Sequence, residues 1–540
     1  MKGGGDKEVH QMSPNFKKGS LVWGIWPHNS RPSSSYSRSL LFSRLMFSVV
    51  LPVCIVFYIM YSLNLVFFSW GLPPCPTSGL DDDMPISRLL SSDNISANST
   101  PEKSRRTSSL KSPDYTPTGL QHIVFGIAAS ASLWGKRREY IKIWWRPGKM
   151  RGYVWLDKPV KEFRYRSTST GLPALKISGD TSKFPYTHKK GSRSAIRISR
   201  IVSETFRLDL PDVRWFVMGD DDTVFIPDNL VRVLSKFDHR QPYYIGSHSE
   251  SHLQNIYFSY GMAYGGGGFA ISRPLAAAIA KMQDGCIKRY PALYGSDDRI
   301  QACMAELGVP LTRHPGFHQY DVYGDLLGLL AAHPVAPLVS LHHLDVVQPI
   351  FPSMTRAAAV KKLFAGPVRF DSAGVIQQSI CYDTTNRWTV SVSWGFAVQI
   401  VRGVMSPREM ETPTRTFLNW YRRADYTAYA FNTRPVARNP CQKPHVYYLS
   451  ATRLNITKRA IVTEYKKHKE KHQSCRWKDN NPADMVDQVL VLKKPDPGLW
   501  DRAPRKNCCK VLSAPRDGEK GNRVLTIEVS VCREGEMSQI

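Results

Sequence analysis

Residues 215–225 read WFVMGDDDTVF, an apolar run that ends in three consecutive carboxylates, Asp220, Asp221 and Asp222. The apolar part is too short for a helix and too hydrophobic for a loop, so it predicts a buried strand of a mostly parallel sheet. Open α/β sheets bind their ligands at the carboxyl ends of the strands, where these acids lie. In an extended backbone Asp220 and Asp222 point the same way and could share one hard cation such as Mn²⁺ or Mg²⁺. The alternative interpretation is a solvated strand end.

Strand and helix patterns alternate around this motif. Short apolar runs predict strands, and runs with helical spacing of apolar residues predict helices. This alternation indicates βαβ units and a parallel sheet. The predicted strands include HIVFGIAAS (122–130), MRGYVWLD (150–157) and YYIGS (243–247), and the helices include SAIRISRIVSETFRL (194–208) and the segment from Pro227 through Leu234.

Two further segments carry candidate site residues. YGMAYGGGGFAIS (260–272) contains Gly266, Gly267 and Gly268, whose backbone could approach a diphosphate or a sugar ring closely. The pattern is not GxGxxG, and taken alone it predicts only a turn. LYGSDDRIQACMAEL (293–307) places Asp297 and Asp298 just before a helix, where one acid could cap the helix and the other face a cleft.

Four histidines and a basic run are further candidates. RHPGFHQYD supplies His314 and His318, and SLHHLD supplies His342 and His343. A histidine near a carboxylate pair is a credible nitrogen ligand for a metal, although a lone histidine is usually structural. The KRR run at 136–138 is interpreted as a solvated face, with contact to phosphate or an acidic glycan as the alternative.

The N-terminal part predicts a membrane topology. Residues 45–70 contain no charge and are long enough to span a bilayer, the preceding residues are mainly basic, and Asp81, Asp82 and Asp83 follow. The positive-inside rule then predicts a cytosolic tail (1–44), a single-pass signal anchor (45–70) and a lumenal stem (71–118) rich in Ser, Thr, Pro and Asp. The chain from about residue 71 onward would then be lumenal, in a single-pass type II protein of the secretory pathway.

Composition adds two expectations. The net charge of +28 would suit nucleic acid, membrane surfaces or anionic substrates, and a lumenal location excludes nucleic acid. Nine cysteines follow the predicted anchor, and an oxidising compartment would pair most of them. Because nine is odd, at least one is free or joined to another chain. A homodimer, disulfide-linked or non-covalent, is a further possibility.

The chain changes character near residue 361. SICYDTTNRWTVSVSWGFAVQIV and RVLTIEVSVC alternate with the period of strands. We therefore expect an α/β domain over 119–360 and a smaller β-rich accessory domain over 361–540.

The motifs together resemble a known family. WFVMGDDDTVF, YGGGGFAIS, GSDDRIQACMAELG and GFHQYD occur in the order found in the fringe-like branch of beta-1,3-glycosyltransferases, most similar to the fringe-related proteins of plants. The likeness covers roughly residues 119–350. It implies a GT-A-type nucleotide-sugar-binding fold, a UDP-sugar donor, Mn²⁺ or another divalent cation, a glycan or glycoprotein acceptor, and an inverting transfer that forms a beta-1,3 linkage.

The resemblance also implies roles for individual residues. Asp222, with Asp220, would hold the metal, and Asp220 and Asp221 would lie near the ribose, the water ligands or the donor sugar. His318, in the slot of the family's FHS motif, would be a second type of metal ligand. Asp298, or its neighbour Asp297, would be the catalytic base that takes the acceptor proton.

Two other functions remain open from the residues. One is a membrane-anchored sugar-binding protein that kept the fold without turnover. The other is a lumenal metal-dependent phosphohydrolase, since acid clusters at strand ends serve that chemistry as well. Acceptor-dependent release of UDP separates the transferase from both.

Overall fold

The computed structural model describes residues 51–69, 116–164, 170–421, 425–457, 459–468, 481–515 and 523–536. Residues 113–540 form one compact unit, and residues 1–112 form another. In the first 112 residues the structure describes one helix, α2 (Leu51–Ser69). Among the described residues no helix is long and apolar enough to cross a membrane, so the predicted anchor over 45–70 is not supported. The predicted tail (1–44) and residues 71–115 of the predicted stem lie outside the described residues.

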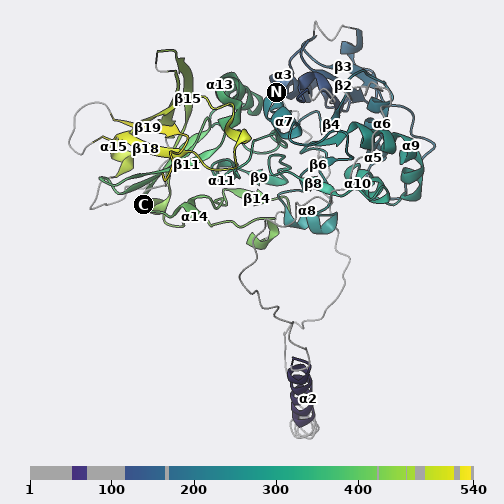
Figure 1. Cartoon of the computed structure of the whole chain (residues 1–540), viewed down its shortest axis with the longest axis horizontal. Coiled ribbons are helices and arrows are strands. Elements are labelled where there is room, and N and C mark those ends of the chain that lie inside the picture. Colours follow the sequence, from purple (N-terminus) through teal and green to yellow (C-terminus); the bar gives the residue numbers. More distant parts are fainter. Residues whose placement is uncertain are drawn as a thin grey trace, which may run out of the picture. The chain divides into compact units, whose positions relative to one another are not determined.

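A seven-stranded sheet forms the first half of the larger unit (Figure 1). Four of its six neighbouring pairs are parallel and two, both made by β7, are antiparallel, so the predicted mostly parallel sheet is confirmed. In spatial order the strands are β3 (Ala174–Ile177), β2 (Arg151–Leu156), β1 (Ile123–Ala128), β4 (Trp215–Asp220), β7 (Phe269–Ser272), β6 (Tyr244–Gly246) and β8 (Leu311–Arg313).

The sheet separates two apolar cores. Along β4, Trp215 and Val217 point into one core, and Phe216 and Met218 point into the other, as the two-residue period of a strand requires. Both faces are therefore buried, which explains why the strand is apolar at each position from Trp215 to Met218. The covering helices are α3 (Trp134–Trp144), α5 (Ser194–Ser199), α6 (Ile201–Phe206), α7 (Pro227–Leu234), α9 (Arg273–Arg289) and α10 (Asp297–Glu306).

One predicted helix is divided. The run 194–208 forms α5 and α6 with Arg200 at the junction, where its backbone N–H is shared between the carbonyl oxygens of Ile196 and Arg197. The Arg200 side chain is held by ion pairs with Glu204 and Asp284. Apolar spacing alone does not reveal such a break.

Short elements connect the two halves of the unit. Two small antiparallel ladders join β5 (Val224–Phe225) to β10 (Ser340–Leu341) and β9 (Val322–Gly324) to β14 (Phe417–Asn419). The remaining helices are α8 (His252–Tyr257), α11 (Leu327–Leu330), α12 (Arg356–Leu363), α13 (Arg369–Asp371), α14 (Pro407–Met410) and α15 (Pro482–Met485).

An eight-stranded sheet follows α12 (Figure 1). All of its pairs are antiparallel except β17 with β19. One apolar core contains residues of both sheets, from β1 to β19. Residue 360 lies inside α12. The predicted boundary between two domains at residues 360 and 361 therefore stays a prediction. The strands are β11 (Gln378–Asp383), β12 (Trp388–Ser393), β13 (Ala397–Arg402), β15 (His445–Asn455), β16 (Ala460–Lys467), β17 (Gln488–Lys493), β19 (Val524–Ser530) and β18 (Cys508–Ser513).

Disulfides hold both halves. Cys286 on α9 is bonded to Cys303 on α10, and two further bonds join Cys381 to Cys509 and Cys508 to Cys532. Extensive pairing is typical of proteins that fold in an oxidising compartment.

Candidate functional site

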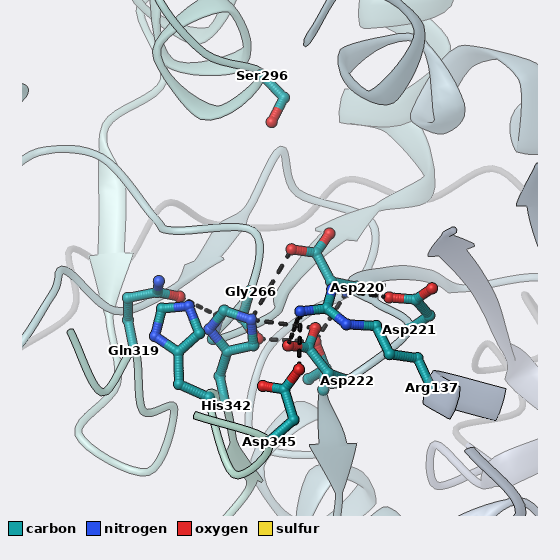
Figure 2. Close-up of polar contacts among 12 residues, drawn as sticks. Arg137, Asp220, Asp221, Asp222, Gly266, Ser296, Gln319, His342 and Asp345 are labelled. Carbon is teal, nitrogen blue, oxygen red and sulfur yellow. Dashed lines mark hydrogen bonds and ion pairs between the residues drawn. The ribbon is translucent and has the colours of Figure 1, made fainter. Parts of the chain in front are cut away.

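The three acids of the WFVMGDDDTVF motif lie at the carboxyl end of β4 (Figure 2). A tight turn follows, because Thr223 N–H donates to the Asp220 carbonyl and Thr223 Oγ1 accepts from Asp220 N–H at 2.8 Å. The turn buries Asp221 and Asp222 completely, while the Asp220 side chain stays 34% exposed. The apolar strand therefore delivers two buried carboxylates and one accessible carboxylate to the same edge of the sheet.

His342 joins these acids. It directly follows β10, whose pairing with β5 places the imidazole beside the turn. His342 Nε2 lies 3.2 Å from Asp222 Oδ1 and 4.0 Å from Asp220 Oδ2. Within the described residues, Asp220, Asp222 and His342 are the one group with ligand atoms close enough, within 4.8 Å of one another, to hold a single metal ion.

The electrostatics of the cluster suit a cation. Partial loss of hydration, with the like charge of Asp222, raises the pKa of Asp220, and full burial beside Asp222 raises that of Asp221 to about 8. Burial alone would also raise the pKa of Asp222, but the positive charge of His342, 3.2 Å away, and that of Arg137 outweigh it and hold that pKa well below its usual range. Neither oxygen of Asp222 accepts a well-directed hydrogen bond from another described residue. Two carboxylates and an imidazole are a donor set that Mn²⁺ accepts, so the residues present fit a divalent metal.

Arg137 on α3 is the main counter-charge to the acids. Its guanidinium lies 3.1 Å from Asp221, 2.9 Å from Asp222 and 3.0 Å from Asp345 (Figure 2). The predicted solvated face at 136–138 is thus wrong for this residue, which is 7% exposed. Although burial opposes it, Asp222 raises the pKa of His342 to about 9, so Arg137 and a charged His342 together face the four carboxyl groups. A divalent cation that displaces the proton of His342 would add positive charge to this cluster.

The glycine segment packs against the same cluster. A side chain at Gly266 would put its Cβ 2.1 Å from His342, and one at Gly265 would reach within 2.7 Å of Asp297. The N–H of Gly267 donates to Gln319 Oε1 at 2.7 Å, and Gly268 N–H donates to the Gly265 carbonyl. The glycines therefore allow His342 and Asp297 to approach, while the N–H groups of Gly267 and Gly268 already have partners instead of facing a diphosphate.

The second acid pair is divided between two tasks. Asp298 accepts hydrogen bonds from the N–H groups of Tyr294 (2.8 Å) and Gly295 (3.0 Å) and so braces the loop before α10. Asp297 lines a small pocket together with Asp220 and Ser296, and in Figure 2 Asp220 points from the acid cluster toward Ser296. Burial, and then the charge of Asp220, raise the pKa of Asp297 to about 7.

His318 lies outside the acid cluster, which corrects its predicted place as a metal ligand. Its Nδ1 is 2.8 Å from Glu250 Oε1 and its Nε2 is 2.9 Å from His333 Nε2. The chain alternates here, so that Gln319 and Asp321 face the acid-cluster side while His318 faces a separate cavity. The sequence alone does not show whether a histidine of GFHQYD or one of SLHHLD lies beside Asp220 and Asp222.

A stack of aromatic rings packs against His342. His342 packs on His343 (3.9 Å between ring centroids), His343 on Trp420 (4.8 Å, interplanar angle 7°), and Trp420 on Tyr323 (4.6 Å, 4°). Trp420 follows β14, and its backbone N–H donates to the backbone carbonyl of Asp321 at 3.1 Å. Residues far beyond the acid motifs thus fix the orientation of the candidate metal-binding histidine.

Removing the stack is expected to loosen the cation site. Trp420→Ala should weaken Mn²⁺ binding about tenfold, the scale found when residues that orient metal ligands are lost. Trp420→Phe keeps a flat ring and should retain most of the affinity. Titration calorimetry with Mn²⁺ measures this, with Leu418→Ala as the control because that side chain on β14 is 64% exposed. Equal Mn²⁺ affinity in the Ala variant and the parent would show that the stack does not position His342.

Parts of the chain are similar to known proteins and protein families. Residues 118–329 match the model of the family described as Fringe-like, and residues 254–509 match a family described as Protein of unknown function, DUF604. Beta-1,3-glucosyltransferase of Mus musculus is 33% identical over 142 residues, which are 25% of this chain and 27% of the relative. The human protein of the same name is 31% identical over 105 residues, 19% of this chain and 20% of the relative.

A third relative carries a different printed activity. Glycoprotein-N-acetylgalactosamine 3-beta-galactosyltransferase 1 of Xenopus laevis is 33% identical over 101 residues, which are 18% of this chain and 26% of that protein. The chain thus spans about a quarter of the length of these relatives. All three are animal proteins, so they do not test the predicted likeness to plant proteins.

Proposed function

Since the chain belongs to the fringe-like beta-1,3-glycosyltransferase family, we propose that it transfers a sugar from a UDP-sugar to a hydroxyl group of a glycan or glycoprotein acceptor, with inversion at the anomeric carbon. The observation that carries the proposal is the cluster of Asp220, Asp222 and His342 at the end of β4, with Asp297 in the adjoining pocket. Donor binding needs a metal-binding cluster, and removal of the acceptor proton needs a separate carboxylate beside it.

The cluster would hold Mn²⁺ or another divalent cation together with the donor diphosphate. When bound, the cation neutralises the negative charge that develops on the departing diphosphate. Asp222 and His342 are rigidly placed, because Arg137 holds the first and the aromatic stack holds the second. Asp220 is the exposed member and therefore faces incoming substrate.

Asp297 is the better placed of the two acids for the catalytic base. It lines the pocket beside Asp220, whereas Asp298 uses both oxygens on backbone N–H groups. In the proposed step Asp297 takes the proton of the acceptor hydroxyl while that oxygen forms a bond to the anomeric carbon. The bond between this carbon and the diphosphate breaks, and UDP departs from the opposite face.

The pH dependence of transfer should follow from the ionisation of Asp297. Its carboxyl must be deprotonated to accept a proton, and its raised pKa of about 7 keeps part of it protonated near neutrality. We expect kcat/KM to fall as the pH is lowered through a pKa at or below about 7, because a cation on Asp220 offsets one cause of the shift. A pH–rate profile checks this. A rate that rises on acidification would contradict a carboxylate base.

Location in the Golgi lumen belongs to the proposal as well. It is supported by the pairing of Cys286 with Cys303, Cys381 with Cys509 and Cys508 with Cys532. Protease protection of a C-terminal tag in intact microsomes tests it. Digestion of the tag without detergent would place this part of the chain in the cytosol.

The proposed activity is tested by incubating the purified protein with Mn²⁺, each common UDP-sugar and a set of glycoside acceptors. Release of UDP that requires both an acceptor and the cation is the expected result. UDP-sugar binding without release would favour a sugar-binding protein. Phosphate release without an acceptor would favour a phosphohydrolase.

A further inference from the structure

Three Asn-X-Ser/Thr sequons occur in the chain, at Asn94, Asn98 and Asn455. A sequon of this kind is the attachment point for an N-linked glycan when the asparagine lies at the surface of a protein that enters the secretory pathway. Asn94 and Asn98 lie outside the described residues, whereas Asn455, Ile456 and Thr457 are all described. The structure therefore shows whether the third sequon has room for a glycan.

Asn455 is the last residue of β15, at the tip of a hairpin. β15 and β16 pair antiparallel, and Asn455 lies opposite Ala460 as the outermost pair. β13 pairs with β15 only over His445–Tyr448, and β17 pairs with β16 only over Ile461–Lys466. The end of the hairpin therefore extends beyond the neighbouring strands of the described sheet.

The tip of this hairpin is open to solvent. Ile456 is 82% exposed, and Leu454 is also exposed. Asn455 is partly exposed, and in an extended strand it shares a face with Arg453, whose side chain is 69% exposed. Neither Leu454 nor Ile456 contributes to an apolar core of the described residues. A bulky group attached to Asn455 can therefore extend into solvent.

The hairpin tip lies away from the candidate active site. β15 belongs to the eight-stranded sheet, whereas the acid cluster lies at the end of β4 in the seven-stranded sheet. The two strands are in different halves of the larger unit in Figure 1. A glycan on Asn455 would therefore leave the approach to Asp220 and Asp297 open.

Two further requirements concern the middle residue of the sequon and the compartment. Proline at the middle position prevents attachment, and this chain has Ile456 there. The compartment must be the lumen of the secretory pathway, which the described disulfides support. The inference below therefore rests on the lumenal location that forms part of the proposed function.

We infer that Asn455 carries an N-linked glycan, which the cell's oligosaccharyltransferase adds from a lipid-linked diphosphate oligosaccharide. Asn455 Nδ2 forms a bond to the anomeric carbon of the first sugar and loses one proton, while the bond between that carbon and the lipid diphosphate breaks. The lipid diphosphate is the leaving group. The attached glycan covers Leu454 and Ile456 with hydrated sugar, so two exposed apolar side chains are shielded from other molecules.

Expression of the full chain with a C-terminal tag in mammalian cells tests the site. Asn94→Gln and Asn98→Gln together leave Asn455 as the single sequon. Treatment of this double variant with peptide-N-glycosidase F should increase its electrophoretic mobility and convert Asn455 to an aspartate, which mass spectrometry of the peptide detects. Adding Asn455→Gln or Thr457→Ala should abolish both changes, whereas Thr457→Ser should retain them because serine still completes the sequon.

Asn432→Gln is the matched control, because Asn432 is exposed and begins no sequon, and it should leave the mobility shift unchanged. Protease protection of the tag in microsomes from the same cells separates the site from the compartment. A protected tag with unmodified Asn455 would overturn the inference and leave the lumenal location standing, whereas a tag digested without detergent would overturn both. A mobility shift that persists after Asn455→Gln would place the glycan elsewhere and also overturn the inference.

Discussion

Asp222→Asn is expected to abolish Mn²⁺-dependent UDP binding and to lower transfer by about a thousandfold or more. Asparagine keeps the shape of the side chain but removes the charge that Asp222 shares with Arg137 and His342. Asp221 and Asp345 still pair with Arg137, so the variant should remain folded. Calorimetry with UDP and Mn²⁺, and initial rates at saturating donor, measure the two losses.

The control for this variant is Asp209→Asn. Asp209 has a side chain that is 90% exposed, and its positive φ of 45° is one that asparagine tolerates. It should bind UDP and turn over like the parent. Unchanged UDP affinity in Asp222→Asn would remove Asp222 from the donor site and leave the acids as a structural ion-pair network.

Asp297→Asn and Asp298→Asn are expected to fail in different ways. At Asp297 the amide cannot accept a proton, so kcat should fall by about a hundredfold or more while UDP binding is retained. At Asp298 the amide group must turn an N–H toward one of two backbone N–H donors, on Tyr294 or Gly295. That mismatch should cost about 1–3 kcal/mol of stability and leave kcat near normal in the folded protein.

Rates and thermal unfolding of both variants separate the roles. A large loss of kcat in Asp298→Asn with none in Asp297→Asn would make Asp298 the catalytic base and leave Asp297 with a structural role. Two variants that both transfer sugar at the parent rate would exclude the pair from catalysis.

The strand and the acids could be predicted from sequence because both are local. An apolar run of four residues followed by carboxylates has one favourable place in an α/β fold, at the carboxyl end of a buried strand. The apolar runs that form β1, β2 and β6 could be predicted in the same way, and so could the helix that begins at Asp297. These elements depend on periodicity and on the residues next to them in the chain.

The partners of the acids could not be predicted, because they come from distant segments. His342 reaches Asp222 through the ladder between β5 and β10, while His318, equally plausible from its neighbours in sequence, is turned into a separate cavity. Arg137 looked like one member of a basic run, yet the packing of α3 buries it. Trp420 lies about two hundred residues beyond Asp222 and arrives through the ladder of β9 with β14.

A crystal of the protein soaked with Mn²⁺ and UDP tests the central claim most directly, through anomalous scattering at the manganese edge. We expect one strong peak within about 2.0–2.6 Å of oxygens of Asp220 or Asp222 and of a ring nitrogen of His342, with the diphosphate of UDP on its open side. A peak at His318 and His333, or UDP bound with no manganese at the end of β4, would contradict it.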